Sequence, residues 1–181
     1  MEDRYKEAAS LIVKAKRVTG FTGAGISVES GIPPFRGEDG LWSKYNPDIL
    51  LLDNYMQNTR EVWSVIKKLF FDFFGDAKPN KAHEVMAWME QNNLMADIIT
   101  QNIDNLHQKA GSSNVHEFHG NSRQFECTKC SKIVPGEHIN LTEKPPECPS
   151  CGGLLKPDFI FFGEPIPSEA YNASVYDAQH S

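Results

Sequence analysis

Residues 17–27, Arg17-Val-Thr-Gly-Phe-Thr-Gly-Ala-Gly-Ile-Ser27, decide how the chain is organised. The run from Arg17 to Thr22 predicts a short strand, which ends in the glycine turn Gly23-Ala24-Gly25. A strand that ends in a glycine turn is the usual context of a phosphate-binding loop, because backbone N–H groups can approach the phosphate there. The third glycine of the dinucleotide-binding fingerprint is absent, since position 28 is Val. Taken alone, the turn leaves an ordinary strand-to-helix connection open.

Helices and short apolar strands alternate along the rest of the chain. Helices are predicted over residues 2–16, from Asn58 or Thr59 to Phe73 or Phe74, over 81–91 and from Ser168 onward, and strands over 96–100, 115–118 and 158–162. Strands without polar alternation indicate a parallel sheet that is covered on both faces. We therefore predict an α/β, Rossmann-like fold whose ligands bind beyond the carboxyl ends of the strands.

The composition indicates a globular protein, with 40% hydrophobic and 23% charged residues in 181. A formal net charge of −6 argues against a nucleic-acid-binding face. No window approaches the length of a membrane span, and the charged N-terminus lacks the apolar core of a secretory signal. We expect a soluble, cytoplasmic protein with no nucleic-acid or membrane partner; the sequence sets no oligomeric state.

All four cysteines lie in two Cys-x-x-Cys pairs, Cys127/Cys130 and Cys148/Cys151, separated by 17 residues. Each pair aims two thiolates at one point, so that two pairs complete a tetrahedral four-sulfur zinc site without an open position. The spacing therefore predicts one structural zinc ion; two disulfides or four free thiols are the alternatives. We assign residues 123–154 to a zinc-ribbon module, inserted between two strands of the larger sheet, and residues 1–122 and 155–181 to the Rossmann-like domain.

The glycine turn continues as Gly23-Ala-Gly-Ile-Ser-Val-Glu-Ser-Gly-Ile-Pro-Pro-Phe-Arg-Gly-Glu-Asp-Gly-Leu-Trp42, which closely resembles the cofactor loop of the sirtuin family. Three further segments follow in the order of the family: Thr100-Gln-Asn-Ile-Asp-Asn-Leu-His107, His119-Gly120 and Lys156-Pro-Asp-Phe-Ile-Phe-Phe-Gly-Glu-Pro165. The resemblance covers the chain from about Val18 to Pro167. It implies an NAD-dependent protein-lysine deacylase or deacetylase that releases nicotinamide and O-acyl-ADP-ribose.

The resemblance also assigns residues to NAD. They are Gly23, Ala24, Gly25 and Ser27 in the glycine turn, Phe35 and Arg36 in a mobile loop over the nicotinamide ribose, and Gln101, Asn102, Ile103 and Asp104 after a strand. An Asn/Asp pair offers the donor and the acceptor that a nicotinamide carboxamide needs, and Arg36 can pair with phosphate. Core packing of Phe35 and a turn or helix cap at Asp104 are the structural alternatives.

His119 is the predicted general base, although composition alone does not choose among the six histidines. A histidine side chain can accept a proton from a ribose hydroxyl near neutral pH. His107 and His116 are predicted to be structural. The resemblance implies that Ile160, Phe161, Phe162 and Gly163 present a strand edge to an extended acyl-lysine peptide.

The chain departs from the family in three places. Pro34 stands where many relatives carry Asp or Thr, and stiffens the mobile loop. The positions of the Tyr and Arg that select succinyl or malonyl groups hold Ile66 and Leu69, which favours acetyl or another uncharged acyl group, although Lys67 and Lys68 are near. The ribose-binding Gly-Thr/Ser-Ser motif and the strands around it do not follow before Ser181. We therefore expect the chain as given to be C-terminally truncated and nearly inactive, with a non-catalytic binding module or a protein ADP-ribosyltransferase as the alternative functions.

Overall fold

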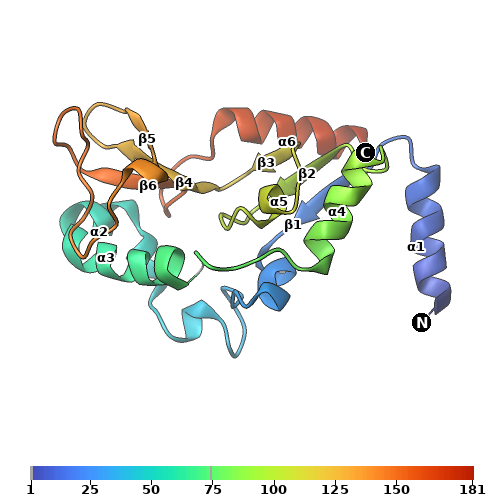
Figure 1. Ribbon diagram of the computed structural model, residues 1–181, viewed down its shortest axis with the longest axis horizontal. Coiled ribbons are helices and arrows are strands. Elements are labelled where there is room, and N and C mark those ends of the chain that lie inside the picture. The colour runs from blue at the N-terminus through green and yellow to red at the C-terminus, as the bar shows by residue number, and fades with distance from the viewer. Residues whose placement is uncertain (1, 74) are drawn as a thin grey trace.

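The computed structural model describes residues 2–73 and 75–181 (Figure 1). Its α-helices are α1 (Glu2–Lys14), α2 (Leu52–Gln57), α3 (Thr59–Ile66), α4 (Lys81–Gln91), α5 (Leu106–Lys109) and α6 (Ser168–His180). Its strands are β1 (Thr19–Thr22), β2 (Asp97–Thr100), β3 (Val115–Glu117), β4 (Gly120–Cys127), β5 (Ile133–Pro135) and β6 (Leu155–Phe159). Short 3-10 helices cover Ala24–Ser30, Leu41–Ser43, Pro47–Leu50 and Gly136–His138, and a π-helix covers Lys67–Phe73.

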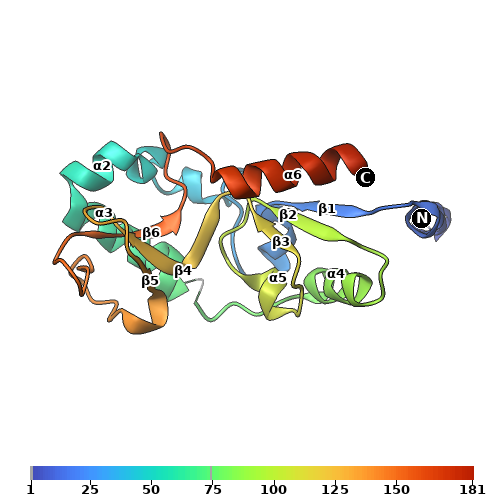
Figure 2. The ribbon, with the colours of Figure 1, turned by 90° about the horizontal axis from the view of Figure 1, so that it is seen from above.

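The larger half of the molecule is built on a parallel sheet in the order β1-β2-β3. Helix α6 lies along one side of this sheet, and α4 and α5 lie along the other (Figure 2). The predicted α/β architecture with helices on both faces is therefore confirmed. Because Thr22 pairs with Thr100 and Thr100 with Glu117, the three strands end at one edge of the sheet. The segments that follow these strands consequently meet there.

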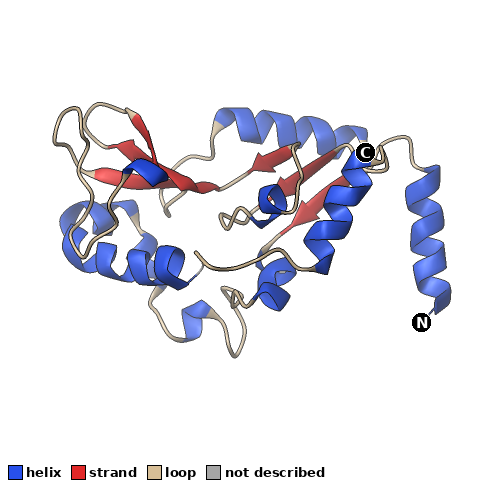
Figure 3. Ribbon diagram, in the orientation of Figure 1, coloured by secondary structure: helices blue, strands red, loops and turns tan. Residues whose placement is uncertain are grey.

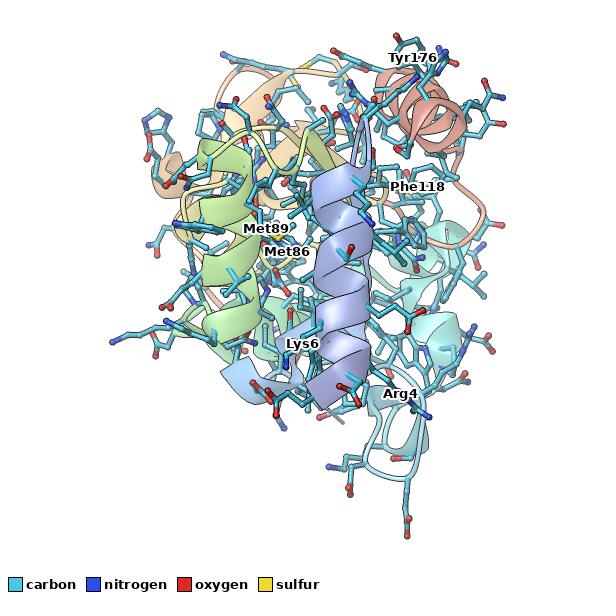
Figure 4. All side chains as sticks on the ribbon, turned by 90° about the vertical axis from the view of Figure 1, so that its right-hand side faces the viewer. Arg4, Lys6, Met86, Met89, Phe118 and Tyr176 are labelled. Atoms are coloured by element: carbon cyan, nitrogen blue, oxygen red, sulfur yellow. The ribbon has the colours of Figure 1, made fainter. Side chains whose placement is uncertain are left out.

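Close packing explains the glycine in the middle of β1. A Cβ atom at Gly20 would lie 2.4 Å from Met86 Cε on α4, so a larger residue would require the flexible Met86 side chain to move. Met86 and Met89 lie on the side of α4 that faces the sheet (Figure 4). The predicted helix over residues 81–91 is confirmed, and Asn80 caps its N-terminus by accepting a hydrogen bond from Ala82 N–H.

The smaller sheet is antiparallel, in the order β5-β4-β6, and two expectations are corrected here. The strand expected over residues 158–162 is instead Leu155–Phe159, and it pairs with β4 rather than with the larger sheet. The cysteine segment therefore does not lie between two strands of the larger sheet. The physical reason is β4, whose eight residues offer both edges for pairing, so that β5 and β6 join it on either side.

Two of the predicted helices end differently from expectation. Helix α3 changes at Lys67 into the π-helix, and Phe74, where the sequence places a possible end, lies outside the described residues. Helix α1 ends at Lys14 rather than at residue 16, and none of its residues is buried. It projects away from the rest of the molecule, with Arg4 and Lys6 on its surface (Figures 1 and 4).

The main apolar core lies between the smaller sheet and α2, α3 and the π-helix. Trp63, Phe125 and Phe161 are fully enclosed in it. Loops occupy much of the space between the two sheets (Figure 3). None of the helices in the described part of the chain has the length and apolar character needed to cross a bilayer.

Candidate active site and cysteine cluster

The carboxyl ends of the parallel strands open on a cavity of about 430 Å³. Ten of the residues assigned from sequence line it: Ala24, Phe35, Arg36, Gln101, Asn102, Ile103, His119, Ile160, Phe161 and Phe162. Gly23, Gly25, Ser27, Asp104 and Gly163 do not line it. The wall is completed by Pro34 and by four residues that sequence reasoning missed as site residues, Trp42, Leu50, Phe70 and Phe159. The cavity is thus apolar over much of its wall, with polar groups from the ends of β2 and β3.

The glycine turn is open on its outer side. A Cβ atom built on Gly23 or Gly25 meets no other atom within 4 Å. Gly23 also has φ −142°, which any residue adopts. Neither backbone strain nor packing inside the chain therefore requires glycine at these positions. The remaining physical reason is the close approach of a ligand to the backbone.

Asn102 holds the glycine turn and the end of β2 together. Its side-chain amide donates to Gly23 O at 3.1 Å and to Ser27 Oγ at 3.2 Å. Ser27 Oγ in turn donates to Asp104 Oδ2 at 2.6 Å. Because both N–H groups of the Asn102 amide are used inside the chain, its Oδ1 atom is left to accept from a ligand. Asp104 also accepts from Leu106 N–H at 3.0 Å, which bears out the turn alternative for this residue.

His119 follows β3 and is held in one tautomer. Its Nδ1 lies 3.2 Å from the Gln101 carbonyl oxygen, which can only accept, so that Nδ1 carries the proton. Nε2 is then left with a lone pair, as a general base requires. The next residue must be glycine, because Gly120 has φ +71° and a Cβ atom there would lie 2.1 Å from Asp158 O. The backbone thus directs the imidazole to the cavity wall.

The four cysteines converge as their spacing predicts. Their Sγ atoms all lie within 4.8 Å of one another, and the closer pairs are 3.4 Å to 3.9 Å apart. Four sulfurs bound to one zinc ion would be about 3.8 Å apart, whereas a disulfide bond is about 2 Å long. A Cβ atom at Gly153 would stand 3.0 Å from Cys127 Sγ, so the cradle also needs a glycine. The donor set fits a structural zinc ion.

Hydrogen bonds to sulfur favour the thiolate form of two cysteines, whereas at Cys151 the Gly153 N–H group lowers the pKa but contacts with the sulfurs of Cys130 and Cys127 outweigh it and raise the pKa to about 12. Burial raises the pKa of the Cys127 thiol, but N–H groups of Lys129 and Cys130 outweigh it and lower the pKa to about 6. The Ser150 N–H group lowers the pKa of Cys148. A metal ion binds thiolates, so two of its ligands are already inclined towards the charged form.

Comparison with known proteins agrees with this arrangement. The Sir2 family model matches residues 23–181, from the glycine turn to the end of the chain. The chain belongs to the Sir2 family. It is 47% identical over 165 residues to "NAD-dependent protein deacylase 1" of Caldanaerobacter subterraneus subsp. tengcongensis, covering 88% of this chain and 66% of that protein. It is 41% identical over 182 residues to "NAD-dependent protein deacetylase 2" of the same organism, covering 98% and 72%.

Solved Sir2 structures show the same fold. A Sir2 in complex with a p53 peptide and NAD+ has a TM-score of 0.85 and 35% identity, over 96% of this chain and 70% of that one. Sir2Tm bound to a propionylated peptide has a TM-score of 0.82 and 33% identity, over 96% and 70%. The present Sir2 chain spans about two thirds of the length of the curated relatives it matches.

The loop predicted to cover the nicotinamide ribose lies folded against the Sir2 cavity. Phe35 packs on Trp42, with ring centroids 5.3 Å apart, and Trp42 N–H donates to Phe35 O at 3.0 Å. Phe35 thus both lines the cavity and packs on the core, so its structural alternative holds as well. Arg36 is exposed at the rim.

The segment from Ile160 to Gly163 uses most of its backbone donors inside the chain. Ile160 N–H donates to His119 O at 2.9 Å, Phe161 N–H to Glu164 Oε2 at 2.7 Å and Phe162 N–H to Leu50 O at 2.7 Å. Among the described residues, the Gly163 N–H group has no partner. A peptide bound along this segment would therefore pair with Gly163 rather than with three successive donors.

A buried lysine, Lys156, stabilises the segment from Ile160 to Gly163. Lys156 Nζ donates to Pro157 O and Phe159 O at 2.8 Å and 3.0 Å, and lies 3.0 Å from Glu164 Oε2. It also stands 4.7 Å from the centre of the Phe161 ring. Charge, hydrogen bonds and a cation–π contact thus converge on one ammonium group, which fixes the turn after β6.

The positions predicted to select an acyl group do not reach the cavity. Ile66 and Leu69 are buried in the core, and Phe70, which follows Leu69 in the π-helix, lines the cavity instead. Lys67 Nζ is paired with Asp72 Oδ2 at 2.7 Å and with Glu143 Oε1 at 3.4 Å. Among the described lining residues, Arg36 is the one cation.

Proposed function

We propose that this Sir2 chain carries out NAD-dependent removal of acyl groups from protein lysine, with release of nicotinamide and O-acyl-ADP-ribose. One observation carries the proposal. A histidine whose Nε2 is free to accept a proton shares one cavity with Asn102 and with Ala24 of the glycine turn. The named activities of relatives more than 40% identical support the same chemistry.

The residues would divide the work as follows. Gly23, Ala24 and Gly25 would admit the phosphates of NAD to the backbone, and Asn102 would hold the nicotinamide carboxamide, with Ser27 and Asp104 orienting its side chain. Bound NAD would supply a ribose carbon that exchanges nicotinamide for the acyl oxygen. His119 would then accept the proton of a ribose hydroxyl at Nε2. Phe35, Arg36, Gln101 and Ile103 would cover and orient the ribose and exclude water.

The substrate would be an acyl-lysine in an extended peptide. The acyl group would lie against the apolar wall of Leu50, Phe70, Phe159 and Phe161, which favours acetyl or another uncharged group over a carboxylate. The peptide would run along Ile160, Phe161, Phe162 and Gly163. A solved Sir2 with a propionylated peptide supports a substrate of this class.

We also propose that the chain divides as its sequence suggests. Residues 123–154 would form a zinc-ribbon module that is stabilised by one ion, and residues 1–122 and 155–181 the NAD-binding part. The cytoplasmic location predicted from composition stays a prediction.

The experiment is an assay of the purified protein with NAD and an acetyl-lysine peptide, in which nicotinamide, free peptide and O-acetyl-ADP-ribose are measured by mass spectrometry. At the low turnover expected from the sequence, the unmodified chain should give the three products in equal amounts, and His119→Ala should give none. Replacing the exposed His138 by Ala is the matched control and should leave the yield unchanged. Absence of NAD-dependent product from the unmodified chain would contradict the proposal in favour of a binding module, and labelled ADP-ribose retained on protein would indicate an ADP-ribosyltransferase.

A further inference from the structure

Two enclosed histidines lie behind the cavity and have no role in the chemistry proposed above. His83 lies on α4 and His107 on α5, and each exposes at most 1% of its surface to solvent. Their rings meet edge to face, with centroids 4.9 Å apart. Burying polar ring nitrogens is costly unless they are hydrogen-bonded, so the pair needs a physical reason.

The surrounding contacts determine where each ring carries its proton. Asn80 N–H donates to His83 Nδ1 at 3.3 Å, so a neutral His83 carries its proton on Nε2. The Thr22 hydroxyl donates its one proton to Thr100 Oγ1 at 2.9 Å. Its 2.9 Å contact with His107 Nε2 therefore requires an Nε2–H group on His107. Both rings are thus expected in the same tautomer.

The two remaining ring nitrogens are buried without a hydrogen bond. His83 Nε2 is then a donor and His107 Nδ1 an acceptor, and neither makes a hydrogen bond to any described residue, the other ring included. Burial lowers the pKa of both histidines, that of His107 to about 4, while the carboxylate of Asp104 opposes the shift. A proton added to His107 Nδ1 would have no acceptor in this buried place, so the pair is compatible only with the neutral state.

A continuous set of hydrogen bonds leads from this pair to the cavity. His107 contacts Thr22 at the end of β1, Thr22 donates to Thr100 at the end of β2, and Asn102 N–H donates to Thr100 Oγ1 at 3.1 Å. Thr22 directly precedes Gly23, whose carbonyl accepts from the Asn102 side chain. The ring of His107 is therefore linked by hydrogen bonds to the ends of β1 and β2, the two segments that meet at Asn102.

We propose that His83 and His107 pack edge to face as a neutral pair that positions Thr22 and Thr100, and through them orients Asn102 for nicotinamide. Both are positioning residues, since neither touches the cavity. The last step, nicotinamide binding, rests on the proposed function; the pair itself does not.

The first test is independent of any ligand. In the protein labelled with 15N-histidine, the ring chemical shifts of His83 and His107 report tautomer and charge directly. We expect two neutral Nε2–H rings at pH 5.5. An Nδ1–H tautomer at either position, or a charged His107 at pH 5.5, would overturn the pair.

The second test separates positioning from general support of the fold. His107→Gln keeps an N–H donor for Thr22, His107→Phe keeps a planar ring without nitrogen, and Thr22→Val removes the hydroxyl that links the pair to Thr100. Nicotinamide and acetyl-lysine peptide affinities are measured by calorimetry, beside the thermal midpoint. We expect about tenfold weaker nicotinamide binding in His107→Phe and Thr22→Val, with peptide affinity unchanged, and a loss below about threefold in His107→Gln.

The outcomes are distinguishable from failure of the proposed function. Unchanged nicotinamide affinity, or an equal loss of nicotinamide and peptide affinity, in Thr22→Val would refute the positioning role. Should His107→Phe fail to fold, the comparison of His107→Gln with Thr22→Val still decides it. An unmodified chain that binds no nicotinamide would refute the nicotinamide step of both proposals, whereas the tautomer measurement would still decide the pair.

Discussion

Gly120 lies so close to the backbone of Asp158 that a Cβ atom at position 120 would stand 2.1 Å from the Asp158 carbonyl oxygen. This contact joins the start of β4 to β6 one residue after His119. The candidate base and the cysteine cluster therefore share a strand: His119 precedes its first residue, and Cys127 is its last. The antiparallel sheet thus supports the site mechanically.

Gly120→Ala should therefore destabilise the chain strongly. The added methyl group meets a backbone carbonyl and is forced into the left-handed region at φ +71°, so we expect a loss of about 3 kcal/mol in the free energy of unfolding. The matched control is Gly152→Ala, at φ +67° with nothing within 4 Å of the new atom, which should cost about 1 kcal/mol. Chemical denaturation of both variants measures the difference; equal losses would show that the Asp158 contact does not matter.

Lys156→Met should be more damaging than its surface counterpart. It leaves the Glu164 carboxylate without its cation in a mostly buried place, and such a loss costs about 3 kcal/mol or more. Lys81→Met breaks the exposed pair with Glu84 and should change stability by less than about 0.5 kcal/mol. Thermal unfolding compares the two. A Lys156→Met variant as stable as Lys81→Met would contradict the buried role of this ammonium group.

Cys127→Ser should remove the zinc ion and unfold the smaller sheet. Cys127 closes β4, so loss of its sulfur opens the tetrahedral set and releases the strand that pairs with β5 and β6. Elemental analysis should give one zinc per unmodified chain and none in the variant, with faster amide exchange in β4–β6. Glu137→Gln, on the exposed surface of the same segment, is the control and should keep its metal.

The sequence predicted most about the larger sheet and its loops. Parallel strands end at one edge, so polar residues that follow separate strands, such as Asn102 and His119, could be expected in one place. The spacing of Cys127, Cys130, Cys148 and Cys151 predicted their convergence because each short turn aims both sulfurs the same way. Both predictions depend on local geometry that the chain determines within a few residues.

Other features depend on long-range packing that has no local signature. Leu50 and Phe70 line the cavity, yet an apolar residue that faces a cavity looks the same in sequence as one that faces the core. The strand expected over residues 158–162 was placed too late because Phe159, Phe161 and Phe162 form one apolar run. In the structure Phe159 ends β6, and Phe162 instead makes an isolated bridge with Leu51. His83 carried no signal at all, since its meaning comes from His107 on another helix.

Acid should destabilise the chain through His107, and a variant of this residue separates its contribution to the pH dependence of stability from that of other groups. Its pKa is lowered to about 4 in the folded chain because the ring is buried, against about 6.5 when unfolded. Between these values the unfolded state binds a proton that the folded state does not. The contribution of His107 to stability is therefore full above pH 6.5 and lost as the pH falls to 4, by about 3 kcal/mol in all.

His107→Phe should flatten the fall in unfolding free energy over that range, whereas His138→Phe, at an exposed ring, should keep the slope of the unmodified chain. Denaturant unfolding at several pH values gives the three curves, and parallel curves for all three would show that His107 is already free to take up its proton in the folded state.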